Sequence, residues 1–557
     1  MKNKYYTLTG LALLSTCAGA AAAEPVNAAG KDKASVSERP NVLFICADQW
    51  RRQAVGFMGE DPIVTPNLDA MSKWCASFDH AISNNPVSGP NRACMFTGKY
   101  TIHNGLWANN TSVDPEEKSA MGTVFKNAGY DTGYIGKWHM NGMVDAVKDP
   151  SRRLGFDYWY QSIAHTHFDQ RYYAPAISEE IFHVKEWSPT HETDLAIEYM
   201  KDHQNGKPYC LVVSFAPPHT AGGYGYEDRY QPGKALKLGY GYGGPREFEA
   251  LYTDDYEKHP IRPNVMATGT DPNTCSSAPV VAGYFGAVTS IDHEIGRMID
   301  YLEESGQLEN TIIVVTADHG EMMGSQGMMT KGVPYEESAG IPMMFAWKGK
   351  IKAARRHDMI SSIDLVPTMA GLADVTCEGA DGLDFSDLLL GKKFNSPEYS
   401  FSEFNYGGIG ARCRPWRAIY TQDYVYILCG PGKLREEHIQ EGYVLYDLKK
   451  DPYQLHPILK GMGYDKVIAK MHKALAAHLD ENHDPFINDL WNTTTDALPL
   501  KPYMNKYNYD PNLKEFPPKA KTKNEKINDK KEKANAGIKK GQKKNGAKKN
   551  HKDNANF

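Results

Sequence analysis

The sequence has 557 residues, of which 41% are hydrophobic and 11% aromatic, and its formal net charge is -5 at pH 7. These values are typical of a globular protein with one large core and room for a second, smaller one. Nine cysteines without CxxC spacing argue against a disulfide-stapled fold, and no apolar run after the leader is long enough to span a membrane. We expect no nucleic-acid partner.

The first 23 residues have the features of an export signal. Lys2 and Lys4 give a positive start, an apolar stretch follows, and residues 21–23 are small alanines suited to cleavage. Cleavage before Cys17 is an alternative, which would leave a lipid-anchored protein. In either case we expect export to the periplasm or the cell surface.

Four short apolar runs rich in β-branched residues predict buried strands of a parallel sheet. They are residues 41–47, 131–136, 209–214 and 311–316. Each run leads into residues that can bind metal or transfer protons, namely Asp48 with Gln49, Lys137 with His139, His219, and Asp318 with His319. Because ligands bind at the carboxyl edge of such sheets, the pattern predicts an α/β fold with an active site at this edge.

A fifth element begins at Ser88, where Pro90 suits a first helical turn and Gly98 can end the helix. Taken alone, Ser88 would be an ordinary serine that caps a helix. The spacing Ser88-x-Pro90-x-Arg92-x-x-x-Phe96-Thr97-Gly98, however, resembles the signature of the type I, arylsulfatase-like sulfatases. That signature has Cys or Ser first and Leu or Met where Phe96 stands, so Phe96 is a departure that affects packing.

Other landmarks of this family follow in the expected order, so the resemblance covers residues 39–490. Beyond the strand that ends at Asp48, they are residues 136–139, 217–219, 316–321, 331–332 and 445–452. The resemblance implies a large alkaline-phosphatase-like α/β domain, with a mostly parallel sheet flanked by helices, and a smaller C-terminal α+β domain with an antiparallel sheet. The predicted divisions are a signal peptide 1–23, a catalytic domain 39–395, a C-terminal subdomain 396–490, an extension 491–518 and a tail 519–557.

The resemblance also implies a modified residue and a metal. In this family the signature Cys or Ser is oxidised to formylglycine, whose hydrated form is the nucleophile, and a serine at this position requires a dedicated serine-type maturase. The implied metal is Ca²⁺, held by Asp48, Gln49, Asp318, His319 and residue 88, a set dominated by the oxygen ligands that calcium prefers. Gln49 departs from the family, where Asp is frequent, so it either coordinates through its amide oxygen or only borders the site.

Five further residues match family positions with roles in the reaction. Arg92 matches the arginine that steadies the formylglycine, and Lys137 and Lys331 match two lysines that contact sulfate oxygens. His139 matches the histidine beside the formylglycine hydroxyls, which releases sulfate and regenerates the aldehyde. His219 matches the general acid that protonates the leaving oxygen.

Two loop regions suit a sugar substrate. Residues 220–260 are rich in Gly and Tyr, and residues 405–417 carry aromatic and Arg side chains that suit sugar rings with carboxylates or sulfates. The same loops could instead cover the joint between the domains. The tail, 519–557, holds 14 Lys against 4 acidic residues and is predicted to be disordered, either binding an anionic glycan or adding solubility.

The predicted function is therefore hydrolysis of a carbohydrate O-sulfate to the alcohol and inorganic sulfate. A phosphoesterase of the wider alkaline-phosphatase superfamily is one alternative, but such sites use two zinc ions and an unmodified Ser or Thr. A non-catalytic, exported glycan-binding protein on a sulfatase scaffold is another. The complete set of six residues argues against it: Ser88, Arg92, Lys137, His139, His219 and Lys331.

Overall fold

The computed structural model describes residues 39–142, 145–163, 165–221, 242–252, 262–265, 278–405, 415–429, 442–484 and 486. The predicted export signal with Cys17, most of the two loop regions, the extension and the tail lie outside these residues. Among the helices that are described, none is long and apolar enough to cross a membrane. The predicted division at residue 395 stays a prediction.

In the described part of the chain, ten strands form one large sheet in the order β10-β2-β9-β8-β1-β7-β3-β4-β5-β6. Strands β8, β1, β7, β3 and β4 are mutually parallel, as are β2 and β10, whereas β9, β5 and β6 run against their neighbours. The bounds are β1 Asn41–Asp48, β2 Cys75–Ile82, β3 Asp131–Lys137, β4 Tyr158–Ile163, β5 Phe168–Ala174, β6 Ser178–Trp187, β7 Tyr209–Pro218, β8 Thr311–Ala317, β9 Met343–Ala346 and β10 Ala354–Ser361.

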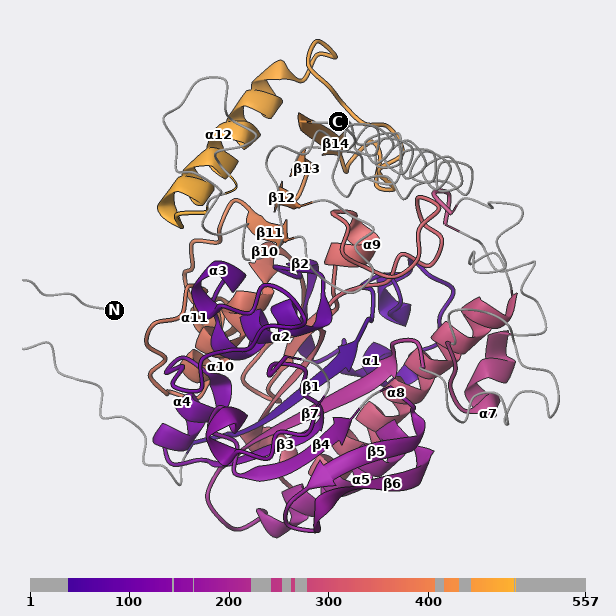
Figure 1. Cartoon of the computed structure of the whole chain (residues 1–557), viewed down its shortest axis with the longest axis vertical. Helices are drawn as coiled ribbons and strands as arrows, with labels where there is room; N and C mark the ends of the chain where they lie inside the picture. Colours follow the sequence, from indigo (N-terminus) through magenta and orange to yellow (C-terminus); the bar gives the residue numbers. More distant parts are fainter. Residues whose placement is uncertain are drawn as a thin grey trace, which may run out of the picture.

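Helices cover both faces of this sheet (Figure 1). One layer contains α5 Ser188–Asp202, α8 Ala278–Glu304 and α1 Pro66–Met71, with the short α7 Arg246–Glu249 packed on α8. The other contains α2 Ser88–Thr97, α3 Thr101–Asn104, α4 Met121–Asn127, α10 Leu365–Leu372 and α11 Ser386–Leu389. The central strands are buried on both sides by these layers, which explains their continuous apolar sequences.

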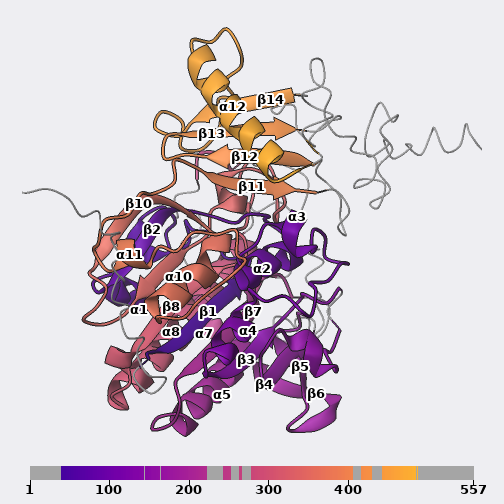
Figure 2. The ribbon, with the colours of Figure 1, turned by 90° about the vertical axis from the view of Figure 1, so that its left-hand side faces the viewer.

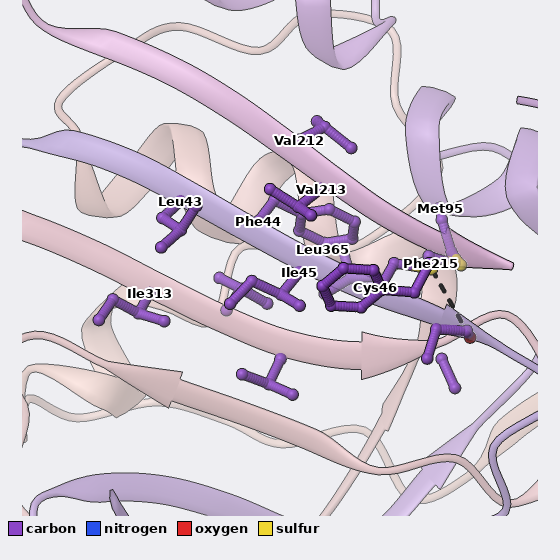
Figure 3. Packing of buried hydrophobic residues seen from close by; sticks show 14 of the residues in the cluster. Leu43, Phe44, Ile45, Cys46, Met95, Val212, Val213, Phe215, Ile313 and Leu365 are labelled. Atoms are coloured by element: carbon purple, nitrogen blue, oxygen red, sulfur yellow. Dashed lines mark hydrogen bonds between the residues drawn. The ribbon is translucent and has the colours of Figure 1, made fainter. Parts of the chain in front are cut away.

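The core between the sheet and α2 shows how this burial is achieved. Phe44 on β1 packs edge-on against Phe96 of α2, with ring centroids 5.7 Å apart. Figure 3 shows Phe44 among the aliphatic side chains of the neighbouring strands and beside Leu365 of α10. Phe96 is therefore a core residue, so its departure from the signature concerns packing.

A second sheet of four antiparallel strands, in the order β11-β12-β13-β14, lies at one end of the large sheet (Figure 2). Its strands are β11 Ser400–Phe404, β12 Trp416–Tyr420, β13 Tyr424–Cys429 and β14 Gly442–Asp447. One face packs on α12 Asp465–Glu481, and the other packs on the segment around Val333 and α9 Glu336–Ala339. The predicted fold class, a large mostly parallel α/β domain with a smaller antiparallel sheet, is confirmed.

Candidate active site

The four predicted strand ends meet at one edge of the large sheet. Strands β8, β1, β7 and β3 are consecutive neighbours and all parallel, so their carboxyl ends lie side by side. This arrangement brings Asp318, Asp48, His219 and Lys137 to the same edge, although up to 270 positions of sequence separate them. The four strand ends therefore share one edge of the sheet, and an active site at this edge stays a prediction.

Three residues form a group that could hold a metal ion. One ligand atom each from Asp48, Asp318 and His319 lies within 4.8 Å of the others, and all three side chains are fully buried. Two carboxylates and an imidazole are a donor set that fits a divalent cation. Gln49 follows Asp48 in a left-handed conformation, with φ at 68°, and its backbone N–H donates to Oδ1 of Asp318 at 3.0 Å.

Ser88 is the first residue of α2, and its side chain does not cap the helix. Its Oγ instead lies 3.0 Å from Nε2 of His319 and donates to Oδ1 of Asp48 at 3.4 Å. Gly98 ends the helix as predicted, with φ at 66° and its N–H bonded to the carbonyl of Cys94. The interpretation of Ser88 as a plain capping serine is therefore wrong, because its hydroxyl points into the candidate metal group.

Arg92, one turn into α2, joins the acidic residues of this group. Its Nε donates to Asp318 at 2.9 Å, and one terminal nitrogen lies 3.4 Å from Asp48. The other terminal nitrogen donates to the carbonyl of Lys137 and to Oγ of Ser214. Burial opposes the charge of Arg92, but the neighbouring acidic groups outweigh burial and raise its pKa.

The two carboxyl groups have different electrostatic surroundings. Burial, together with the negative charge of Asp48, raises the pKa of Asp318. Burial acts in the same direction at Asp48, but Lys137, His219 and Arg92 outweigh it and lower the pKa of Asp48 well below its usual range. Asp48 is therefore the more firmly ionised of the two acids.

Lys137 and His139 enter from the end of β3. The Lys137 ammonium donates to Oδ2 of Asp48, and burial lowers the pKa of this lysine to about 8. Gly136 has φ at 104°, and a Cβ there would lie 2.1 Å from the carbonyl oxygen of Ser214, so only glycine allows β3 to approach β7 here. A Cβ on Gly89 would lie 3.1 Å from the His139 carbonyl, which places His139 beside the start of α2.

His219 and Lys331, which lie at the same site as Asp48 and Gln49, contact each other. The Lys331 ammonium lies 2.8 Å from Nε2 of His219, while Nδ1 of His219 lies 2.9 Å from the carbonyl of Thr220. The carbonyl can only accept, so Nδ1 carries the proton and Nε2 faces Lys331. Burial, and then the charge of Lys331, lower the pKa of His219 well below its usual range.

Two further histidines surround His219, and the sequence analysis did not identify them. The ring of His165 stacks on that of His219 with centroids 4.3 Å apart and planes 19° from parallel. Nε2 of His167 donates to the carbonyl of His219 at 2.7 Å. Both follow β4, which is parallel to β3, so the signal that identified the other strand ends could have identified them as well.

Every predicted site residue except His139 thus lies in one connected cluster. Ser88, Arg92, Lys137, Asp48, Asp318 and His319 are linked by direct contacts, and Lys331 joins His219 to Gln49. His139 lies beside them, next to Gly89. A buried cluster of cations around two acids and a hydroxyl suits an anionic ester substrate.

The fold and this cluster define an alkaline-phosphatase-like α/β enzyme, and the comparisons with known proteins identify which kind. The model of the sulfatase family matches residues 40–375, so the chain belongs to the sulfatase family. It is a sulfuric ester hydrolase. Residues 324–481 also match the model described as N-sulphoglucosamine sulphohydrolase, C-terminal.

Individual relatives cover most of the chain. An ulvan-active sulfatase of Formosa agariphila is 29% identical over 497 residues, which is 86% of this chain and 88% of the relative. An endo-4-O-sulfatase of Bacteroides thetaiotaomicron is 27% identical over 83% of this chain and 96% of the relative. A solved structure concerned with glycosaminoglycan metabolism in that organism superposes with a TM-score of 0.68 at 26% identity, over 81% of this chain and 98% of the other.

Proposed function

We propose that this sulfatase removes sulfate from a sugar hydroxyl, with residue 88 as the position that bears the nucleophile. The observation that carries the proposal is the place of the Ser88 hydroxyl, which contacts His319 and Asp48 rather than a helix cap. A hydroxyl held in this way, with two lysines nearby, is arranged for attack on an anionic centre.

Two groups would complete the site. Oxidation of Ser88 to formylglycine by a serine-type maturase, followed by hydration, would supply a geminal diol as the nucleophile. A Ca²⁺ ion held by Asp48, Asp318, His319 and residue 88 would lower the pKa of a hydroxyl and bind a sulfate oxygen. The donor set described above, with two buried carboxylates, fits such an ion.

The cations of the chain bind and orient the ester. Lys137 and Lys331 answer the negative charge of the sulfate oxygens, most strongly where that charge grows in the transition state. Arg92 forms ion pairs with Asp318 and Asp48 and so fixes the positions of these two carboxylates. Because Arg92 and Lys137 are buried and Lys331 is partly buried, their interactions with an anion are stronger than they would be in water.

Two histidines move protons. His219 protonates the leaving alcohol oxygen from Nε2, since its Nδ1 is committed to the carbonyl of Thr220. Burial, and then the charge of Lys331, lower the pKa of His219, and the arrival of a sulfate anion beside both groups favours the protonated form. His139, whose Nδ1 is buried without a hydrogen-bond partner among the described residues, accepts the proton that accompanies sulfate release.

The substrate class rests on the relatives and on the loop sequences. The relatives include an N-acetylglucosamine-6-O-sulfatase, which acts on a sulfated sugar by name, together with an ulvan-active sulfatase and an endo-4-O-sulfatase. The aromatic and Arg residues of the predicted loops 220–260 and 405–417 suit the same chemistry. Export to the periplasm or cell surface, where sulfated glycans are met, is part of this proposal.

Mass spectrometry and a substrate panel test the proposal together. After co-expression with a serine-type maturase, the tryptic peptide 74–92 should lose two hydrogens, and Ser88→Ala should show no such change. The modified protein should hydrolyse some members of a panel of regiospecifically sulfated mono- and disaccharides. A protein with unmodified Ser88, phosphatase activity and two bound zinc ions would favour the phosphoesterase instead. A modified protein that is inactive on every sulfate ester would contradict the proposal.

A further inference from the structure

A buried chain of hydrogen bonds links Lys331 to two residues that have no place in the reaction described above. The Lys331 ammonium donates to Oε1 of Gln49, and Nε2 of Gln49 donates to Oε2 of Glu321. Both Gln49 and Glu321 are fully buried. Nε2 of Gln49 also donates to the hydroxyl of Tyr242 at 3.1 Å.

The orientation of the Gln49 amide follows from its partners. An ammonium group has only donors, so the atom that faces Lys331 must be the amide oxygen. A carboxylate has only acceptors, so the atom that faces Glu321 must be the amide nitrogen. Both ends of the amide are therefore engaged, and its oxygen is directed to Lys331.

Glu321 also holds the loop that carries Lys331. Its Oε1 accepts the backbone N–H groups of Met323 at 2.9 Å and Thr330 at 2.6 Å, at the two ends of that loop. The N–H of Met322 donates in turn to the carbonyl of Thr330. One carboxylate thus fixes both the backbone before Lys331 and the amide that receives its ammonium.

We propose that Gln49 and Glu321 are positioning residues for Lys331, and that Gln49 is a bridge to this lysine rather than a ligand of the metal. The proposal rests on the role of Lys331 at sulfate in the proposed function. It assigns a reason to glutamine at position 49, because an Asp or Glu there would face the Glu321 carboxylate. It leaves Asp48, Asp318, His319 and residue 88 to hold the cation.

The proposal predicts a specific rescue. Glu321→Gln keeps an oxygen for Met323 and Thr330 but turns an amide nitrogen toward that of Gln49, so two donors would face each other. Gln49→Glu alone places two carboxylates together. The double variant Gln49→Glu with Glu321→Gln restores a donor opposite an acceptor and keeps an oxygen toward Lys331, with the same total charge as the parent.

The experiment measures kcat and KM of the metal-loaded, maturase-modified enzyme for the parent, both single variants and the double variant. Each single variant should lower kcat/KM by about 10- to 100-fold, mainly through kcat, because a misplaced lysine loses its transition-state contact. The double variant should return to within about tenfold of the parent, a non-additivity expected only of directly coupled residues. The affinity for inorganic sulfate, measured by calorimetry, should follow the same pattern.

Two surface changes of the same chemistry serve as controls. Glu303→Gln and Gln204→Glu alter exposed residues at the opposite edge of the sheet and should leave kcat, KM and sulfate affinity unchanged. Thermal unfolding of every variant identifies loss of folding. If a single variant does not fold, Tyr242→Phe, which removes the hydroxyl that contacts the Gln49 amide and Glu321, should still lower kcat a few-fold without a change in the modification of Ser88.

If the double variant loses kcat/KM by the product of the two single losses, the proposal is overturned. That result is expected if Gln49 binds the metal and Glu321 acts elsewhere. Full activity of both single variants would overturn it as well. Lys331→Ala separates these results from the proposed function. If Lys331→Ala is inactive while the two single variants are not coupled, only the positioning proposal fails, whereas a parent enzyme inactive on all sulfate esters would contradict the proposed function itself.

Discussion

The indole N–H of Trp416 donates to the carbonyl of Gly332 at 3.0 Å, so the antiparallel sheet is bonded directly to the residue after Lys331. Trp416 is fully buried and its ring stacks near that of Phe404. The smaller sheet is therefore tied to the loop that carries Lys331, the lysine to which the proposed function gives a role at sulfate.

Trp416→Phe should weaken both stability and turnover. It removes one buried hydrogen bond, which should lower the free energy of unfolding by about 1 kcal/mol, and it frees the carbonyl of Gly332. We expect kcat on a sulfated sugar to fall several-fold. Trp347→Phe is the matched control, since Trp347 also donates to a carbonyl at 3.0 Å but does so at the surface. Equal values of kcat for Trp416→Phe and Trp347→Phe would show that the hydrogen bond from Trp416 to Gly332 does not affect turnover.

Ser88→Ala should abolish turnover and leave the fold intact. The hydroxyl makes no cap bond, so its loss should cost less than the roughly 1 kcal/mol of a typical capping serine. Rates on a sulfated sugar and thermal unfolding curves, measured on the same preparation, check both parts. Turnover at the level of the parent would exclude residue 88 as the nucleophile.

Chelation should remove activity, and Ca²⁺ should restore it better than Zn²⁺, because carboxylate oxygens dominate the donor set. Ca²⁺ should also raise the unfolding temperature of the chelated protein, since it binds only the folded state. Asp318→Asn should lose most of that rise. An unfolding temperature that does not depend on Ca²⁺ would argue against the metal site.

His219→Ala should slow sugar sulfates far more than an activated aryl sulfate. An alkoxide needs protonation as the S–O bond breaks, and general acid catalysis supplies about 10²- to 10⁴-fold, whereas a nitrophenolate leaves without help. Lys331→Ala should slow hydrolysis of both substrates, because Lys331 stabilises negative charge on the sulfate. The rates of the two variants on the two substrates decide which residue is the general acid. Equal losses for His219→Ala on the sugar sulfate and the aryl sulfate would show that His219 is not the general acid.

His478 should make the C-terminal region sensitive to acid. Its ring packs 4.1 Å from that of Phe401, and burial lowers its pKa from 6.5 to about 4. As the pH falls, His478 is protonated in the unfolded chain before it is protonated in the folded protein. The contribution of neutral His478 to the free energy of unfolding is therefore present above about pH 6.5 and is lost as the pH falls toward 4, by up to about 3 kcal/mol.

His478→Leu should therefore flatten the dependence of the denaturant midpoint on pH between 7 and 5, relative to the parent. His456→Leu, at an exposed position, is the control and should change nothing. The same slope for His478→Leu and the parent would show that the other buried histidines dominate acid unfolding.

The sequence predicted that these polar residues share one edge of the sheet, because they directly follow apolar strands. Asp48, Lys137, His219 and Asp318 stand at or just beyond the ends of apolar runs, and parallel strands must align those ends. Ser88 and Lys331 required the family resemblance, since a serine at a helix start and a lysine in a loop have no periodic signal. In the structure Ser88 contacts Asp48 and His319, and Lys331 contacts His219 and Gln49.

What the sequence could not predict is which side chains contact across the sheet. Nothing in the order of residues indicates that Gln49 meets Lys331, 282 positions later, or that His165 stacks on His219. These contacts depend on side-chain directions at the end of each strand. They had to be observed.

The burial of Ser88 also sets an order of events. Only 2% of the residue is exposed, and Asp48 and His319 surround its hydroxyl. On the proposed function, an oxidising enzyme needs the β-carbon of Ser88 in its own active site, so it would have to act while the chain is still unfolded. Folding and maturation would then compete in time, and a molecule that folds first would keep an unmodified serine.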